Sequence, residues 1–223
     1  YVRFNHWRVT TFHMVTTDTR QRLLDVAEGL FADQGLKGTS LRAITLKAEA
    51  NLAAVNYHFE TKEGLFAAVF QRRIGPMTVE RIRLLDQALE ATAPDAPALE
   101  DVLRAYLAPA LGLLTSRDPG AVNFPRLLGR VFSEPGEIKM QVLSQFRPSA
   151  ERFLEVLAQI LPELPHAELM WRLHFLIGSL AHTTASGKLI CLMSGGACDP
   201  NDVEGLLERL TTYAAAGFQA PSR

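Results

Sequence analysis

Side chains that suit contact with nucleic acid are concentrated between residues 51 and 62, in the sequence NLAAVNYHFETK. The amides of Asn51 and Asn56 can each hydrogen-bond the edge of a base. The methyl group of Ala53 or Ala54 can pack on a thymine methyl. A helix that enters the major groove of DNA is short and presents small or polar side chains outward. The spacing therefore indicates a recognition helix.

Groups that can bind phosphate lie at the end of this stretch. Tyr57 and His58 can donate to phosphate oxygens, and Lys62 can neutralise a phosphate charge. Such contacts fix the position of a protein on a duplex without reading its sequence. The complete set of candidate DNA-contacting residues is Thr39, Ser40, Arg42, Asn51, Ala53, Ala54, Asn56, Tyr57, His58 and Lys62.

Helical periodicity predicts the elements that position these residues. A first helix is expected from Thr19 to a C-terminal cap at Gly35, because its apolar residues recur on one face. Those residues are Leu23, Leu24, Ala27, Leu30 and Phe31. Thr39 or Ser40 is placed to cap a short second helix that ends near residues 49–51.

The same reasoning predicts two more helices. Asn51 caps a third helix that ends at about residue 57 or 58, with Val55 and Phe59 pointing inward. A fourth helix begins at Lys62 and bends or breaks near Ile74, because a Gly-Pro pair follows at 75–76. We expect a domain boundary at this break.

Three parts of this region resemble the DNA-binding module of TetR-type (tetracycline-repressor-type) regulators: TSL at 39–41, VNYHF at 55–59 and KEGL at 62–65. The resemblance covers roughly residues 19–70. It implies a helix-turn-helix that binds operator DNA, and most often a repressor. One departure is Glu49, which stands in the turn where the family usually carries Gly. The turn therefore has to adopt a backbone conformation that a non-glycine residue tolerates.

The rest of the chain predicts a larger helical domain. Helical spacing recurs, with Pro and Gly between the segments, at about 76–91, 98–115, 121–133, 136–160, 166–193 and 201–215. The segment 124–135 is similar to one in TetR subgroups that include fatty-acid and acyl-thioester responsive repressors. The resemblance implies that this domain senses a small, largely apolar ligand.

Five residues of this domain are candidates for contact with that ligand: Phe124, Arg130, Phe132, Trp171 and Phe175. For the four aromatic residues, ordinary core packing is the alternative. Arg130 lies in an apolar stretch, and a buried guanidinium needs a partner. That partner is either Glu134, four residues later, or a carboxylate or phosphate of the ligand.

The last two long segments are expected to form a homodimer interface. Gly178, Ala181 and Ala185 give a small-residue face that allows close approach of helices. Leu206, Leu207 and Leu210 belong to an apolar stripe on the final helix. Two helices from each subunit would form a four-helix interface, whose twofold symmetry matches a palindromic operator.

Composition excludes several other classes of protein. The chain of 223 residues has a net charge of −1, so DNA binding has to come from a local patch. Its two cysteines form no disulfide framework, which indicates a reducing cytoplasm, and the resemblance implies that of a bacterium. The apolar stretch 169–193 is interrupted by charged residues and His, so we expect a buried helix and no membrane contact. A secretory leader is not evident.

The sequence predicts no catalytic, cofactor or metal site. The chain has no Gly-rich phosphate loop and no GxSxG motif, so we expect neither an enzyme nor a cofactor. His166, His174 and His182 are spaced by eight residues, which rotates each by roughly 80° from the last along a helix. They share no face, and no metal site is expected.

The sequence thus predicts an all-α protein in three parts. Residues 1–17 form a disordered or vector-derived arm, since Met14 precedes a plausible native start; alternatively, Arg3 and Arg8 reach a DNA minor groove. Residues 18–74 form a three-helix, helix-turn-helix DNA-binding domain, and residues 75–223 a helical-bundle domain for ligand sensing and dimerisation. The alternative function is a helical protein-interaction module without DNA binding.

Overall fold

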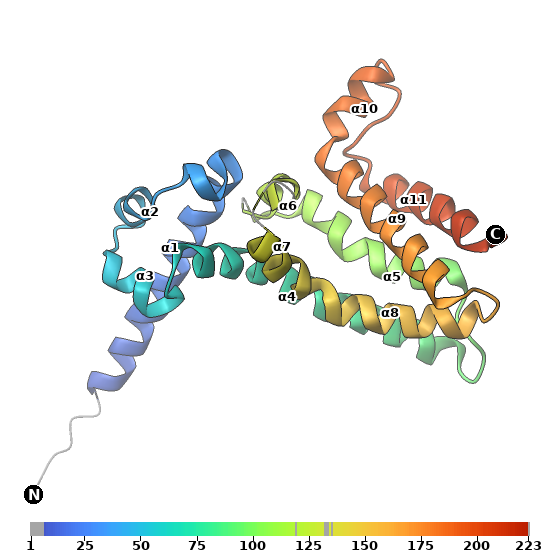
Figure 1. The fold of residues 1–223 in the computed structure, drawn as a ribbon, viewed down its shortest axis with the longest axis horizontal. Coiled ribbons are helices and arrows are strands. Elements are labelled where there is room, and N and C mark those ends of the chain that lie inside the picture. Colours follow the sequence, from blue (N-terminus) through green and yellow to red (C-terminus); the bar gives the residue numbers. More distant parts are fainter. Residues whose placement is uncertain (1–6, 119, 132–133, 135, 223) are drawn as a thin grey trace, which may run out of the picture.

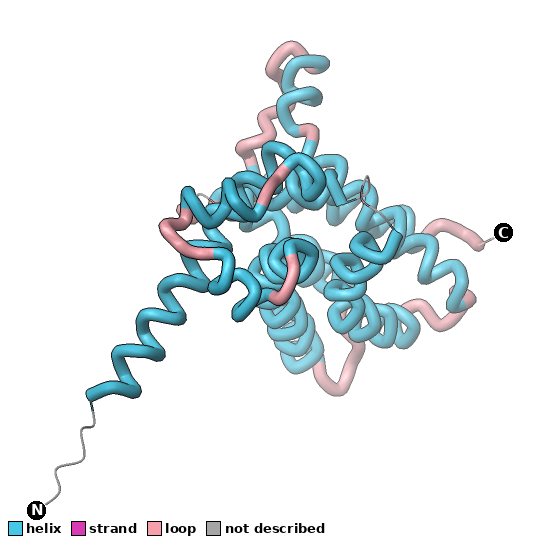
Figure 2. Tube along the Cα trace, turned by 60° about the vertical axis from the view of Figure 1, so that its left-hand side comes forward, coloured by secondary structure: helices cyan, strands magenta, loops and turns pink. Residues whose placement is uncertain are grey.

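The computed structural model describes residues 7–118, 120–131, 134 and 136–222, without the side chains of residues 7–17 and Val122. Every regular element in these ranges is a helix, which confirms the all-α prediction (Figures 1 and 2). The α-helices are α1 (Trp7–Gly38), α2 (Leu41–Lys47), α3 (Leu52–Phe59), α4 (Lys62–Thr92), α5 (Leu99–Leu111), α6 (Phe124–Val131), α7 (Gly136–Leu143), α8 (Arg147–Ile160), α9 (His166–Ala185), α10 (Gly187–Met193) and α11 (Val203–Gln219). Short 3-10 helices span 112–115, 121–123 and 144–146.

Helices α1, α2 and α3 pack on the first half of α4 around one apolar core. Its centre is a row of phenylalanine rings in edge-to-face contact, Phe31 on Phe66 and Phe66 on Phe70. Phe124 of α6 extends the row by contact with Phe70. The core of the DNA-binding unit therefore continues into the second half of the chain.

Side-chain caps begin three successive helices as their sequences predict. Ser40 Oγ accepts from the Ala43 N–H at the start of α2, and Asn51 Oδ1 accepts from the Ala54 N–H at the start of α3. Thr61 Oγ1 accepts from the Gly64 N–H at the start of α4. Each bond satisfies a backbone donor that has no partner within the first helical turn.

Helix α4 runs without a break from Lys62 to Thr92, so of the expected bend or break near Pro76 the break was wrong. A proline inside a helix costs about 3 kcal/mol through a lost hydrogen bond and a steric clash. Ile74 and Met77, on either side of Pro76, are buried in the first core, while Leu85 further along is buried in the second. Burial of residues on both sides of the proline stabilises the helix by more than the proline destabilises it. Helix α4 therefore joins the two units as one continuous helix.

Helix α1 also differs from its prediction. It begins at Trp7, before the expected start near Thr19, and residues 1–6, with Arg3, lie outside the described part. Gly35 has a φ of 72° at the predicted cap position, and helical structure resumes to Gly38 after this kink. Glycine adopts this left-handed conformation without the steric penalty that a Cβ brings.

The second core joins α4, α5, α8, α9 and α11. The predicted segment 136–160 contains two α-helices, α7 and α8, with a 3-10 turn between them. The predicted segment 166–193 is divided at Ser186 into α9 and α10, and α10 projects from the body of the protein (Figure 1). No single described helix is long and apolar enough to cross a membrane; α9 and α10 pass that test only together and are bent by 75°.

Candidate DNA interface and ligand cavity

Helix α3 presents a polar outer face of the kind expected for a recognition helix. Val55 and Phe59 are buried in the core, as predicted, and hold the helix in place. Ala53, Asn56 and Tyr57 are exposed on its outer side, with Tyr57 75% exposed. Ala54, in contrast, is half-buried and packs against the core, which leaves Ala53 as the methyl group available to a base.

The two asparagines of the candidate interface differ in how much of the side-chain amide is available to contact DNA. Asn51 uses its Oδ1 to cap α3 at 2.8 Å from the Ala54 nitrogen. An amide that reads adenine uses its oxygen and its nitrogen together. Asn51 keeps only its NH2 group for DNA while it caps the helix. The side chain of Asn56 is exposed further along α3 and caps no helix in the described structure.

Thr39 is a structural residue, and its prediction as a DNA contact was wrong. Its side chain is 1% exposed, and Oγ1 donates to the Gly35 carbonyl at 2.8 Å. A buried hydroxyl that already has its acceptor cannot reach a phosphate. Ser40 and Arg42 are exposed and keep their candidate roles, with the Ser40 hydroxyl also capping α2.

Lys62 also has a structural role that its sequence position did not reveal. Its ammonium donates to the carbonyl of Leu36 at 2.9 Å and to that of Thr39 at 3.1 Å. It therefore satisfies carbonyls at the end of α1, where a positive charge is also favourable. Only the third ammonium proton remains for a phosphate.

His58 is half-buried beside the exposed ring of Tyr57, with the ring centroids 4.9 Å apart. Burial lowers the pKa of His58, and the positive charge of Arg20 lowers it further. The imidazole is therefore neutral at neutral pH and offers one N–H donor to a phosphate instead of two.

The turn between α2 and α3 shows how Glu49 replaces the usual glycine. Glu49 has a φ of 51°, in the left-handed region, and follows the C-cap Ala48. The Ala50 N–H donates to the Thr45 carbonyl at 2.9 Å, and the Glu49 N–H to the Leu46 carbonyl at 3.3 Å. These two bonds define a Schellman motif, which satisfies the last carbonyls of α2. The expected non-glycine turn is thus confirmed.

An ionic cluster connects α1 to α4 and to the segment before α6. Glu28 of α1 is 1% exposed and accepts from Arg73 Nε and Nη2, both at 2.7 Å. Arg72 donates to the same carboxylate, and Arg73 also donates to Asp118. These bonds raise the pKa of Arg73 and hold the pKa of Asp118 below its usual range.

A second link joins α6 to the end of α1. Arg130 Nε donates to the Ala32 carbonyl at 2.7 Å, and its Nη2 donates to the Asp33 carbonyl at 2.6 Å. Glu134 accepts from the Leu36 N–H at 3.2 Å, so it is not the partner of Arg130. Both readings of Arg130, a Glu134 pair and a ligand contact, were therefore wrong. Its guanidinium binds the DNA-binding unit.

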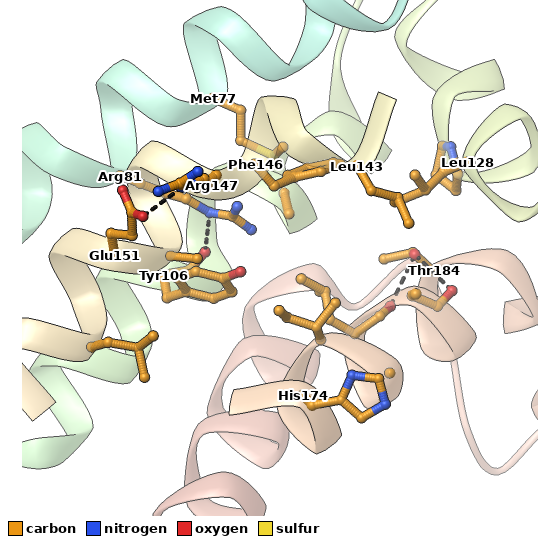
Figure 3. A pocket seen from close by; sticks show the side chains of 18 of the residues that line it. Met77, Arg81, Tyr106, Leu128, Leu143, Phe146, Arg147, Glu151, His174 and Thr184 are labelled. Carbon is orange, nitrogen blue, oxygen red and sulfur yellow. Dashed lines mark hydrogen bonds and ion pairs between the residues drawn. The ribbon is translucent and has the colours of Figure 1, made fainter. Parts of the chain in front are cut away.

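The second unit contains a cavity of about 920 Å³, part of whose wall is formed by α9 (Figure 3). Its volume falls within the range of sites that bury small molecules. The wall is mainly apolar and is formed by residues of α4 to α9 and of the 3-10 helices at 112–115 and 144–146, such as Met77, Leu113, Phe124, Leu128, Phe146 and Leu154. Phe124 is the candidate ligand residue that lies in this wall.

Two other aromatic candidates do not line the cavity. Trp171 and Phe175 are 57% and 61% exposed on α9, where their rings stack with centroids 5.8 Å apart. They were wrong as ligand residues, because neither lines the cavity, although both rings contact His174, which does. Phe132 falls outside the described residues.

Some of the predicted dimer residues lie in the protomer's own core or cavity wall, and others are exposed. Leu207 and Leu210 are each 7% exposed and pack within the protomer's own second core, with Leu206 half-buried beside them. Leu207 and Leu210 were wrong as interface residues because the apolar stripe of α11 faces the protomer's own helices, chiefly α5, whereas the interface role of Leu206 stays a prediction. Ala181 and Gly178 both line the cavity, and Gly178 is also exposed to solvent. Ala185 is exposed.

Comparison with known proteins identifies the family. Residues 23–69 match the family described as "Bacterial regulatory proteins, tetR family", and residues 104–217 match the "Tetracyclin repressor-like, C-terminal domain". The chain belongs to the TetR family. TetR-family proteins are transcription regulators with a DNA-binding unit and a ligand-binding unit, which confirms that the chain is not an enzyme.

Relatives of this TetR-family chain were found by sequence and by structure. The HTH-type transcriptional regulator AcrR of Shigella flexneri is 38% identical over 66 residues, which are 28% of this chain and 31% of that protein. The match thus spans about a third of the relative's length. The fatty acid degradation regulator FadR from Bacillus halodurans has a TM-score of 0.64 and 14% identity, over 91% of this chain and 97% of its own.

A second FadR structure, from Bacillus subtilis in complex with stearoyl-CoA, has a TM-score of 0.67 and 12% identity, over 88% of this chain and 98% of its own. At such identities the similarity shows the fold alone. It supports the TetR-type arrangement of both units in this chain.

Sequence reasoning missed two residues of this TetR-family cavity that carry polar chemistry. Arg81 of α4 and Tyr106 of α5 both line it and are both buried. A signal was present, since Arg81 lies four residues after Met77 and four before Leu85, on the buried face of α4. A charged residue inside an apolar stripe marks a site that needs a partner.

Proposed function

We propose that this TetR-family protein binds a palindromic operator as a homodimer and represses transcription until a small, largely apolar molecule enters the cavity. The observation that carries the proposal is the outer face of α3. Asn56, Tyr57 and Ala53 are exposed on a helix that Val55 and Phe59 anchor in the core. Acting on the chromosome, such a repressor would work in the bacterial cytoplasm.

Selection of bound sequences from a random pool of duplex DNA tests this proposal. We expect the protein to enrich a palindrome, and Asn56→Ala to relax the preference at one position of each half-site, at a cost of about 1–3 kcal/mol per base contact. Tyr57→Ala should weaken binding to all sequences alike, since a phosphate contact carries no sequence information.

The matched control is Arg83→Ala, which removes a positive charge from the exposed Arg83–Glu80 pair on α4 and should leave operator binding unchanged. Lys62→Ala is unsuitable because it would free two carbonyls at the end of α1. A protein that enriches no sequence at low salt would contradict DNA binding and favour the interaction module. Binding by that module would also lack the steep salt dependence of DNA binding.

The outward sides of α9 and α11 support the homodimer. Trp171 and Phe175 form an exposed aromatic pair on α9, beside the small exposed residues Gly178 and Ala185. Tyr213 is 69% exposed on the outer side of α11. Exposed apolar patches of this kind mark sites of association. A Phe175→Glu protein that stays a dimer by sedimentation at micromolar concentration would count against this interface.

Helix α6 supports a route from the cavity to the DNA-binding unit. Its Phe124 and Leu128 lie in the cavity wall, while Arg126 and Arg130 donate to the Ala32 carbonyl of α1. A ligand that displaces α6 would therefore move α1, and the spacing of the two recognition helices in the dimer would change. The ligand would shift the population toward a dimer that does not fit successive major grooves.

Arg130→Ala tests this route. We expect the variant to bind operator and ligand with affinities within a few-fold of the parent, while the ligand releases it from DNA less completely. Operator affinity measured by fluorescence anisotropy, with and without ligand, gives the coupling factor, and coupling energies are typically about 1–3 kcal/mol. An unchanged coupling factor in Arg130→Ala would exclude this link, with Arg83→Ala as the control.

A further inference from the structure

Arg81 is a buried cation in the wall of the cavity. Its side chain is 2% exposed at the middle of α4, and Nε donates to the Tyr106 carbonyl at 2.8 Å. The guanidinium carbon lies 3.9 Å from the centre of the Tyr106 ring, which is a cation–π contact. Figure 3 shows the guanidinium beside Tyr106, at the edge of the space that the labelled residues surround.

The far end of this guanidinium has no partner of opposite charge. Nη1 is buried and has no hydrogen-bond acceptor within the described part of the chain. The carboxylate of Glu151, which also lines the cavity, accepts from Arg147 at 2.5 Å and forms no ion pair with Arg81. Burial lowers the pKa of Arg81, but a guanidinium stays protonated in proteins.

An uncompensated charge in this position is unfavourable, since the ring and carbonyl of Tyr106 replace only part of the lost hydration. A bound anion would supply both the missing acceptor and the missing charge. The rest of the wall has the opposite character, because the residues around Arg81 are mainly aliphatic and aromatic. Among the described residues, the cavity wall thus combines one unpaired guanidinium with a long apolar surface.

We propose that this cavity binds an aliphatic carboxylate, whose carboxylate group pairs with the guanidinium of Arg81 and whose hydrocarbon chain lies along the apolar wall. This inference deepens the proposed function and rests on it, since it names the chemical class of the ligand. The single unpaired guanidinium in the described part of the wall suits a singly charged group. The other arginine of the wall, Arg147, is already paired.

An acyl thioester is the contrasting ligand. Its hydrocarbon chain ends in an uncharged carbonyl, and in a CoA thioester the negative charges lie on the phosphates at the other end of the molecule. Such a ligand would leave the charge of Arg81 without compensation if its hydrocarbon chain filled the cavity. The two ligand classes therefore differ in whether the buried head group is charged, and binding experiments can separate them.

The test measures binding to the purified protein, without DNA, by isothermal titration of dodecanoate and hexadecanoate and of the alcohols of the same length. We expect each carboxylate to bind at least ~10-fold more tightly than its alcohol, as a charged hydrogen bond allows. Arg81→Met, which keeps an apolar side chain of similar length, should remove this preference and still bind the alcohols. Arg147→Met is the matched control and should retain the preference.

The inference would be overturned if the parent protein bound acid and alcohol with equal affinity, or bound neither series. It would also be overturned if Arg81→Met still preferred the acids. Dodecanoyl-CoA binding more tightly than dodecanoate would overturn it in favour of the thioester. If Arg81→Met does not fold, Arg81→Gln and the parent's own preference decide the question.

Operator release is measured separately with the same compounds. Selective carboxylate binding that leaves the operator complex intact would support the Arg81 site and count against the proposed switch. Release by the alcohols as readily as by the acids would support the switch and count against the site.

Discussion

Replacement of Glu28 by Gln should lower the free energy of unfolding by about 3–5 kcal/mol, the usual result of removing one partner from a buried ion pair. Glu28 is 1% exposed, and its two oxygens accept from Arg73 at 2.7 Å and from Arg72. A neutral amide keeps the shape of the side chain but leaves two largely buried guanidinium groups without their shared negative charge. Urea unfolding followed by circular dichroism measures the change.

Asp33→Asn is the matched control for this prediction. Asp33 also pairs with an arginine of another helix, Arg126, but its side chain is 62% exposed and that of Arg126 is 56% exposed. Exposed ion pairs contribute about 0–1 kcal/mol. If the two variants unfold at the same urea concentration, the buried cluster is not a major source of stability.

The second large effect is expected at Gly64, where alanine should destabilise the protein by about 3 kcal/mol, at the upper end for overpacking. Gly64 lies in the first turn of α4, and a Cβ there would come closer than 3.0 Å to the backbone carbonyl oxygen of Phe59. That oxygen is fixed, because it also accepts from the Thr61 N–H at 2.6 Å. A backbone atom at the end of the recognition helix has to move to make room.

The direction of the change in stability distinguishes this steric clash from the usual effect of alanine in a helix. Alanine in place of glycine inside a helix normally stabilises by up to about 1 kcal/mol. Gly29→Ala on α1 is the control that should follow this rule, because nothing outside its own helix lies within 4 Å of the added Cβ. Thermal melting should therefore move in opposite directions for the two variants, and operator affinity should fall only for Gly64→Ala. A melting temperature of Gly64→Ala at or above that of the parent would refute the steric argument.

The sequence by itself determined the local structure of the DNA-binding unit. The caps formed by Ser40 and Asn51 were predictable because each bond spans only three residues. The inward placement of Val55 and Phe59 followed from helical periodicity. The family could be identified for the same reason, since its motif residues lie within one short stretch.

Only the tertiary structure decided the partners of charged residues. Lys62 donates to carbonyls at the end of α1, and Arg130 to carbonyls nearly a hundred residues earlier in the chain. Spacing predicted a phosphate and a nearby Glu134 because these were the partners visible from sequence. A charged side chain takes whichever group the fold brings within reach, and the sequence does not give that distance.

The same limit applies to apolar faces and to the proline in α4. The stripe containing Leu207 and Leu210 showed that one side of α11 is buried, but periodicity does not say whether a neighbouring helix or a second subunit covers it. Pro76 disfavours a helix locally, yet α4 continues because burial on both sides of it contributes more. Local propensity is set by a few neighbouring residues, whereas burial is set by the whole fold.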